Sequence, residues 1–406
     1  MSDVKTYTNT DSIRILIVVM LFVLAPHRGS CESFSIDTNF AGGNIFVENI
    51  SGDTLFVRPD LRDTEGEWFY WYFKIRGAEN RLLTVQFTQS NVFSSAGPVL
   101  SRDGRNWSYL DKNCWQDGQF QHSFSERDSC LSFAVAIPYT QHNWDQFLTT
   151  LLPNEKLAID TLCFSRENRP VERLTISPPE RAPQYRVLIT ARHHACEMMA
   201  NYVIEGLILT ILESQKLQWC REQVEFTIIP FVDKDGVEDG DQGKNRKPRD
   251  HGRDYEGESL YKSTAAIRAQ IPAWSDGKLA LVLDIHCPWI KGQYNEFIYI
   301  VGSASQDNAK EQIKFSQLLQ EQNVSELPFS ADDLLPFGTA WNTGDNYAKG
   351  ISLSKWGRSL KGVSLSTSLE FPYTTVYDKQ VTVENARGFG ETIASAMQEY
   401  LRRLKK

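Results

Sequence analysis

The sequence predicts an α/β protein with a mixed, mostly parallel sheet flanked by helices and preceded by an antiparallel β-sandwich domain. Two patterns lead to this prediction. Residues 34–137 consist of short alternating or aromatic runs separated by turn signals, which is typical of antiparallel strands. From residue 139 onward, apolar runs alternate with longer segments of helical period, as in sheets buried on both faces. At 406 residues the chain has room for two such domains.

Residues 1–31 are expected to be a signal peptide. Lys5 and Arg14 precede an apolar run at residues 15–25, and small or polar residues follow as far as Cys31. This run is about half of the roughly 20 residues that a membrane-spanning helix needs. We therefore expect export to the periplasm or the medium, with no stable membrane span after cleavage. A lipoprotein anchored through Cys31 is an alternative that the sequence leaves open.

Residues 32–137 are predicted to form the β-sandwich domain. Strands are expected where aromatic and β-branched residues alternate, as in residues 67–77 and 131–139. Cys114 and Cys130 lie in this domain, and in an exported protein they could form a disulfide or remain free thiols. The seven cysteines of the chain include no CxxC pair, which argues against a thiolate zinc cluster.

Residues 138–406 are predicted to form the second domain, in which strands and helices alternate. Strands are expected at residues 186–191, 226–232 and 279–285, and helices at residues 143–152, 197–214 and 384–406. The basic end of the last helix suits the negative pole of a helix C-terminus.

The composition argues against two classes of protein. The chain has 51 acidic and 43 basic residues and a net charge of -8, whereas nucleic-acid binders usually carry a basic surplus. We therefore expect no nucleic-acid partner. The hydrophobic fraction of 41% and the lack of low-complexity tracts indicate a folded globular protein rather than a disordered one.

Three side chains follow two of the predicted strands in a pattern that suits a metal ion. His194 and Glu197 stand three residues apart where one strand gives way to a helix, so an imidazole and a carboxylate meet at one point. His286 comes directly after the strand at residues 279–285, and Asp284 could orient its ring. Each motif alone is more typical of a surface pair or a core histidine. Together they predict the open, three-ligand arrangement of a catalytic zinc at the carboxyl ends of strands.

Glu370 lies in another predicted strand, within the run GVSLSTSLEFPY near the C-terminus. A carboxylate in an apolar strand is costly to bury unless something uses it. Beside a zinc ion it would act as general base for the metal-bound water, whose pKa the metal lowers to about 7. The alternative interpretation is an outward-facing strand residue.

In their order along the chain these motifs resemble the zinc metallocarboxypeptidase family, which has His-x-x-Glu, a His after a strand and a catalytic Glu near the C-terminus. The resemblance covers residues 139–406. It implies an eight-stranded, carboxypeptidase-like sheet, a Zn²⁺ cofactor, and hydrolysis of the C-terminal peptide bond of peptides or proteins. Residues 58–77 and 97–111, RPDLRDTEGEWFYWYFKIRG and GPVLSRDGRNWSYLD, are similar to the β-sandwich that precedes the catalytic domain in the cytosolic-carboxypeptidase branch.

The resemblance also assigns roles in and near the run GKNRKPRDHGRDY, residues 243–255. Arg246 would polarise the scissile carbonyl, and Arg253 would hold the terminal carboxylate of the substrate. Gly252 departs from the family, which usually has Asn at this position, so half of the carboxylate clamp is missing at a cost of about 1–3 kcal/mol in substrate binding. Tyr347 is the candidate for the substrate-capping tyrosine of the family.

Lys355 stands fifteen residues before Glu370, at the distance where the family carries the residue that selects the substrate's terminal side chain. A cation at the base of that pocket would favour a C-terminal Glu or Asp. A basic residue in a surface loop is the simpler interpretation of Lys355.

Two other functions remain open at this point. One is a deacylase of the related amidohydrolase type, which shares His-x-x-Glu and a later His but acts on acylated amino acids. Gly252 favours this alternative, whereas the preceding β domain argues against it. A decayed enzyme that only binds peptide tails is the other, and the presence of all three ligands together with Glu370 argues against it.

Overall fold

The computed structural model describes residues 34–178 and 182–404. The predicted signal peptide, with Cys31 at its end, lies outside the described residues. Within the described part of the chain, no helix combines the length and the apolar character that crossing a membrane requires.

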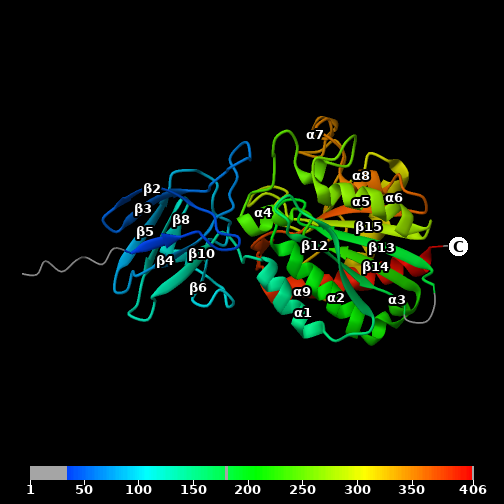
Figure 1. Cartoon of the computed structure of the whole chain (residues 1–406), viewed down its shortest axis with the longest axis horizontal. Helices are drawn as coiled ribbons and strands as arrows, with labels where there is room; N and C mark the ends of the chain where they lie inside the picture. Colours follow the sequence, from blue (N-terminus) through cyan, green and yellow to red (C-terminus); the bar gives the residue numbers. More distant parts are fainter. Residues whose placement is uncertain (1–33, 179–181, 405–406) are drawn as a thin grey trace, which may run out of the picture. The chain divides into compact units, whose positions relative to one another are not determined.

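The N-terminal part contains two five-stranded sheets, as the alternating runs predicted (Figure 1). The first sheet has the order β1 (Ser35–Asp37), β4 (Tyr72–Arg76), β10 (Cys130–Ala134), β6 (Val99–Ser101) and β7 (Ser108–Tyr109). The second has the order β2 (Phe46–Ser51), β3 (Thr54–Arg58), β5 (Leu82–Phe87), β9 (Gln119–Ser123) and β8 (Trp115–Gln116). Phe120 of β9 and Phe133 of β10 meet between the two sheets, with their ring centroids 5.2 Å apart.

One strand pair in the second sheet differs from the predicted antiparallel arrangement. β3 and β5 run parallel, whereas the other pairings among the described strands of this part are antiparallel. The reason is that the chain leaves the sheet after β3, forms β4 in the opposite sheet and then returns. A connection of this kind brings the next strand back in the original direction.

The cysteines in the described residues are free thiols, so the structure has the second of the two predicted alternatives. Cys114 precedes β8 and Cys130 begins β10, and these strands belong to different sheets.

Both parts of the described chain belong to one compact unit that begins at Phe34. The domain boundary near residue 137 therefore stays a prediction.

The C-terminal part is built on the eight-stranded mixed sheet that the resemblance implied. Its order is β11 (Leu157–Phe164), β12 (Pro170–Ile176), β14 (Val224–Ile229), β13 (Tyr185–Ala191), β15 (Leu279–His286), β18 (Leu365–Glu370), β16 (Tyr299–Val301) and β17 (Leu334–Leu335). The central strands β14, β13, β15 and β18 are parallel to one another. The outer pairs β11/β12, β12/β14 and β16/β18 are antiparallel, which makes the sheet mixed.

Helices cover both faces of this sheet (Figure 1). Those on one face are α1 (Gln141–Leu151), α2 (Met199–Glu213) and α9 (Val383–Arg403), and α5 (Lys262–Ser275) and α8 (Leu353–Gly357) lie on the other. The remaining α-helices described are α3 (Gln218–Gln223), α4 (Lys234–Asp239), α6 (Gln306–Glu321) and α7 (Gly344–Tyr347). Side chains of β13 alternate accordingly: Val187 and Ile189 pack in the core that contains α2 and α9, and Leu188 packs in the core that contains α5.

The order of the strands fixes where a ligand site is expected. β13 lies between β14 and β15 in the sheet. After β13 the chain forms β14 on one side of it and then β15 on the other side. In open α/β sheets, ligands bind at such a switch point, outside the carboxyl ends of the strands. β13, β15 and β18 end at this edge with Ala191, His286 and Glu370.

Candidate metal centre and active site

His194, Glu197 and His286 come together at the carboxyl edge of the sheet. The Nδ1 atom of His194 lies 2.9 Å from Oε1 of Glu197, and Nδ1 of His286 lies 2.9 Å from Oε2 of the same carboxylate. One ligand atom from each of the three residues lies within 4.8 Å of the others. His194 and His286 are 92 positions apart in the sequence, yet with Glu197 they form one group of side chains that could bind a metal ion.

The loop between β13 and α2 places the first two of these side chains. Arg192 is buried with a positive φ of 59°, and its guanidinium donates to the carbonyl oxygens of Ala195 and Tyr139. The backbone N–H of Glu197 donates to the carbonyl of His194 at 3.2 Å, which closes a turn. The helix was predicted to begin at residue 197 but begins at Met199, so the two residues meet through this turn, just before the helix.

The donor set and the charge around it fit a zinc ion. Two imidazole nitrogens and one carboxylate are ordinary zinc ligands, with bond lengths of about 2.0–2.2 Å. Burial lowers the pKa of His286, but the carboxylates of Asp284 and Glu197 outweigh it and raise that pKa well above its usual value. The same negative field favours a divalent cation between the three side chains.

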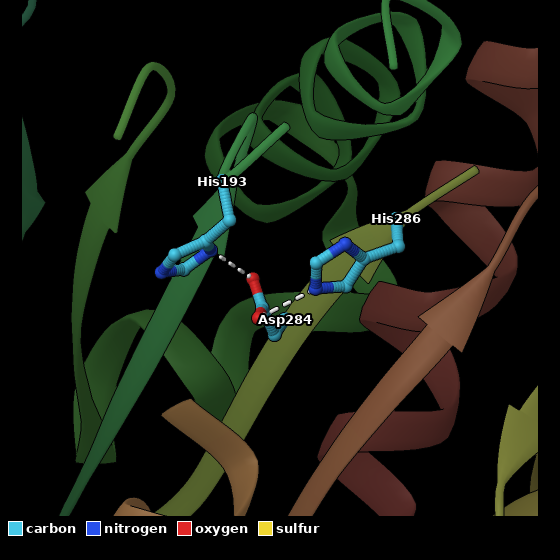
Figure 2. Close-up of side chains that lie close together, drawn as sticks. All are labelled: His193, Asp284 and His286. Carbon is cyan, nitrogen blue, oxygen red and sulfur yellow. Dashed lines mark hydrogen bonds and ion pairs between the residues drawn. The ribbon is translucent and has the colours of Figure 1, made fainter. Parts of the chain in front are cut away.

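Asp284 joins His286 to a second, fully buried histidine (Figure 2). Its Oδ2 atom lies 2.7 Å from Nε2 of His286, and its Oδ1 atom lies 2.9 Å from Nδ1 of His193. Oδ1 also accepts a hydrogen bond from the hydroxyl of Thr190 at 2.7 Å. Nε2 of His193 in turn lies 2.7 Å from the hydroxyl of Tyr255. Asp284 therefore orients the His286 ring and leaves its Nδ1 atom to face Glu197.

His193, Asp284 and His286 also have the residue types and spacing of a metal site. In this second group, however, both carboxylate oxygens of Asp284 are already hydrogen-bonded, to Thr190, His193 and His286, and Nε2 of His193 lies 2.7 Å from the hydroxyl of Tyr255. His194 and His286 line the cavity over the site that is described below, and His193 and Asp284 are not part of that lining. The group with His194 is therefore the candidate metal centre. Asp284 contacts its ligand His286 through a hydrogen bond, and His193 contacts Asp284 in turn.

We expect Asp284→Asn to lower the affinity for zinc by about 10- to 100-fold, because the support of a histidine ligand sets its orientation and tautomer. Competition with a chromophoric chelator would measure this affinity. Asp276→Asn is a matched control, since Asp276 is exposed in a turn and its φ of 46° suits Asn. Equal zinc affinities in the two variants would contradict the role given to Asp284.

Glu370 is in register with His286 on the neighbouring strand. The residue is 6% exposed, and its Oε2 atom has no hydrogen-bond partner among the described residues. Burial raises the pKa of Glu370, and the charge of Glu197 adds to this effect, although His286 and Lys244 oppose it. A buried carboxylate with a raised pKa and an unpaired oxygen is well suited to accept and return a proton.

A cavity of about 310 Å³ opens over the candidate metal centre, lined by His194, His286 and Glu370 among others. Arg253 and Tyr347 also line it, as the resemblance implied for residues that bind substrate. The guanidinium carbon of Arg253 lies 5.3 Å from the centre of the Tyr347 ring. No carboxylate of the described residues forms an ion pair with Arg253, so the guanidinium is available to an anionic ligand.

Arg246, which was predicted to polarise the scissile carbonyl, is not among the residues that line this cavity. Its guanidinium forms ion pairs with Asp233, Asp241 and Asp63 and is 6% exposed. Asp233 and Asp241 are near Arg246 in the sequence, whereas Asp63 belongs to the N-terminal β region. These ion pairs direct the guanidinium of Arg246 to carboxylates outside the lining of the cavity.

Lys244, for which the sequence predicted no role, lines the cavity instead. Its Nζ atom lies 2.7 Å from Oε1 of Glu197 and donates to the carbonyl of Cys287 at 3.1 Å. Burial lowers the pKa of Lys244, but Glu197 and Glu370 act more strongly and raise it above its usual value, so the side chain stays an ammonium ion. Nothing within the run GKNRKPR distinguishes Lys244 from Arg246, because the distinction depends on partners outside this run.

Gly252 lies against the first ligand. A Cβ atom at this position would lie 2.8 Å from Nε2 of His194, which is closer than side chains tolerate. His194 also faces Asp250, with Nε2 and Oδ1 3.6 Å apart. A side chain at position 252 would therefore require the His194 ring to shift.

Lys355 lines a second cavity, of about 360 Å³, which shares Val301 and Tyr347 with the first. Its Nζ atom lies 5.7 Å from the centre of the Tyr347 ring, the same ring that Arg253 approaches. Arg358 is the other charged residue of this lining, and no acidic residue contributes to it. The second cavity is therefore positively charged.

Comparison with known proteins agrees with this fold. The sequence profile of the zinc carboxypeptidases matches residues 152–266, which include His194 and Glu197. The fold is that of the metallocarboxypeptidases: a metallo-carboxypeptidase from Burkholderia cenocepacia superposes with a TM-score of 0.74 over 91% of this chain and 99% of its own, at 22% identity.

Among curated proteins, the chain is similar to cytosolic carboxypeptidase 2 of Mus musculus, with 30% identity over 243 residues. This alignment covers 50% of the chain and 27% of the mouse protein. A protein of Zymomonas mobilis is 25% identical over 215 residues, which are 50% of this chain and 54% of that protein. The chain thus matches about half of the length of the bacterial relative and a smaller share of the mouse one.

Proposed function

We propose that this protein is a zinc metallocarboxypeptidase that removes the C-terminal residue of peptides or proteins. The observation that carries the proposal is the convergence of His194, Glu197, His286 and Glu370 at a cavity of about 310 Å³. Three protein ligands beside an open cavity are typical of catalytic zinc, whereas structural zinc sites are closed by four. The likeness to carboxypeptidases in the matched region supports the reaction class.

In this proposal His194, Glu197 and His286 hold the ion. Zinc bound there would lower the pKa of water to about 7 and polarise a carbonyl group. Glu370 takes the proton of the attacking water, and it gives this proton to the leaving nitrogen as the C–N bond breaks. Lys244 stabilises the negative charge that develops on the scissile carbonyl oxygen, the role first expected of Arg246.

Arg253 and Tyr347 would bind the terminal carboxylate of the substrate. Arg253 lines the cavity without an acidic partner in the described chain, and a guanidinium can hold a carboxylate through two hydrogen bonds. The missing Asn side chain at Gly252 leaves this clamp with one residue fewer. We expect weaker substrate binding than a complete clamp would give, by about 1–3 kcal/mol.

The second cavity supports a preference for acidic C-terminal residues. Lys355 and Arg358 line it without an acid, and it adjoins the first cavity at Tyr347. A Glu or Asp side chain that extended past Tyr347 would meet these cations, whereas a Lys side chain would be repelled. Export under the signal peptide at residues 1–31 remains part of the proposal and places these substrates outside the cytoplasm.

The test is the release of free amino acid from peptides that differ only in a final Glu, Leu or Lys. We expect release to stop after treatment with a chelator and to return with Zn²⁺, and the Glu peptide to be cleaved fastest. Lys355→Met should reduce the advantage of the Glu peptide over the Leu peptide by about 10- to 100-fold, the value of a hydrogen bond to a charged group. Lys361→Met, an exposed residue of the same region, is the matched control.

The results would separate the alternatives. Equal or faster cleavage of the Lys peptide would remove the acidic preference and leave the carboxypeptidase proposal intact. Release from acylated amino acids but not from peptides would favour the deacylase, which Gly252 also suits. Peptide binding without any release, in protein that contains zinc, would favour a module that has lost its activity.

A further inference from the structure

The segment that carries Lys244 is held by the N-terminal β region. Gln242 is fully buried, and its side-chain amide forms two hydrogen bonds with the backbone of Tyr70, each 2.8 Å long. The carbonyl of Gln242 accepts a hydrogen bond from the N–H of Cys196, in the loop that carries the candidate zinc ligands. Gln242 thus ties the β region to this loop.

The same contact continues along the next residues. The N–H of Glu65 donates to the carbonyl of Asn245 at 3.3 Å, and Thr64 and Arg246 form an isolated antiparallel bridge. A Cβ atom at Gly243, whose φ is 77°, would lie 2.1 Å from the backbone nitrogen of Ala195. The segment 242–246 therefore lies between the β region and the metal loop, and at Gly243 it packs too closely against that loop to admit a side chain.

Trp68 is the residue through which the β region reaches the cavity. Its side chain is partly buried and lines the cavity, with the ring centre 5.3 Å from Nζ of Lys244. Two contacts fix the indole: its N–H donates to the carbonyl of Glu65, and its ring meets Trp289 edge to face at 4.7 Å. An indole face attracts an ammonium ion, most strongly where water is partly excluded.

The hydrogen-bonding capacity of Lys244 shows what this contact could achieve. An ammonium group has three N–H donors. Glu197 and the carbonyl of Cys287 account for two of them. Among the described residues, no other acceptor is bonded to Nζ, so one donor is left for a ligand in the cavity.

We propose that the N-terminal β region forms part of the active site, in which Trp68 is a positioning residue that holds the Lys244 ammonium in place for the scissile carbonyl. This inference rests on the proposed function, because it assigns Lys244 to the hydrolytic step. It gives the β region a role in catalysis beyond that of a separate binding module.

A double-mutant cycle tests the proposal, with Trp68→Leu, Lys244→Met and the double variant. Loss of Lys244 should reduce kcat by about 10²- to 10³-fold, as for the loss of one oxyanion donor. Trp68→Leu should reduce kcat by about 2- to 30-fold, with KM little changed, and Trp68→Phe should restore part of it because a phenyl ring also attracts cations. In the Lys244→Met background, Trp68→Leu should have no further effect.

Trp107→Leu is the matched control. Trp107 is also partly buried in the β region, and its indole N–H donates to the carbonyl three residues earlier, as that of Trp68 does. It should leave kcat unchanged. An equal loss from Trp68→Leu with and without Lys244 would overturn the proposal, because the effect would then come from folding alone. If Trp68→Leu does not fold, the same comparison with Trp68→Phe decides.

A measurement independent of activity separates this inference from the proposed function. Amidination of Lys244 by methyl acetimidate, followed by mass spectrometry, reports how firmly the ammonium is held. We expect faster modification in Trp68→Leu and an unchanged rate in Trp107→Leu. If the wild type cleaves no peptide, the proposed function fails while this rate still reports on the contact. An unchanged rate in Trp68→Leu would overturn the inference.

Discussion

Replacing Glu370 with Gln is expected to reduce kcat by about 10²- to 10⁴-fold, the usual contribution of a general acid–base residue. The amide has nearly the same shape but cannot accept a proton from water. Zinc content should stay at the wild-type level, because Glu370 is not one of the three residues around the candidate ion. The measurement is steady-state hydrolysis of a peptide, with metal analysis of the same preparation.

Glu205→Gln is the control for this change. Glu205 is likewise buried, and burial raises its pKa as it does that of Glu370, but it bonds to Tyr139 and Arg387 and does not line the cavity. It should alter stability while kcat of the folded protein stays near that of the wild type. Full activity of Glu370→Gln with zinc bound would remove Glu370 from the mechanism.

Replacing Arg246 with Met is expected to cost about 3–5 kcal/mol of the free energy of unfolding, because it leaves buried carboxylates without their cation. Asp233 and Asp241 both pair with Arg246, and their side chains are 2% and 15% exposed. Urea denaturation would measure the loss as a shift in the midpoint. At a temperature where the variant is folded, kcat should fall far less than in Lys244→Met.

Lys247→Met is the control beside it. Lys247 pairs with Glu65, but both side chains are exposed, at 71% and 59%. Such surface pairs contribute about 0–1 kcal/mol, so the midpoint should hardly move. If Arg246→Met kept its stability and lost activity, the catalytic role that the sequence predicted for Arg246 would return.

The sequence was sufficient to predict the part of the site that strand order determines. His194, His286 and Glu370 each follow or end a strand that could be predicted from its apolar run, and parallel strands end at one edge of a sheet. It was not sufficient to choose between Lys244 and Arg246. These residues are two positions apart, and their different surroundings depend on partners outside the run that carries them: Glu197 and Trp68 for Lys244, and Asp233, Asp241 and Asp63 for Arg246.

The same limit applies to residues that meet only in three dimensions. The hydrogen bonds from Tyr255 through His193 to Asp284 join three segments, and none of these segments carries a local pattern that indicates the contact. The parallel pairing of β3 and β5 was missed for a related reason, because it depends on which sheet the intervening strand joins. Alternation within a strand does not contain this information.

The pairing of His286 with Glu370 across β15 and β18 has a consequence for how purified protein should be judged. Side chains alternate along a strand, so a slip of one residue would turn Glu370 to the opposite face of the sheet. Under the proposed function, molecules with this shifted register would still bind zinc through His194, Glu197 and His286 but would not hydrolyse peptide. The number of turnovers per bound zinc ion would therefore measure the fraction of molecules in which β18 has the correct register.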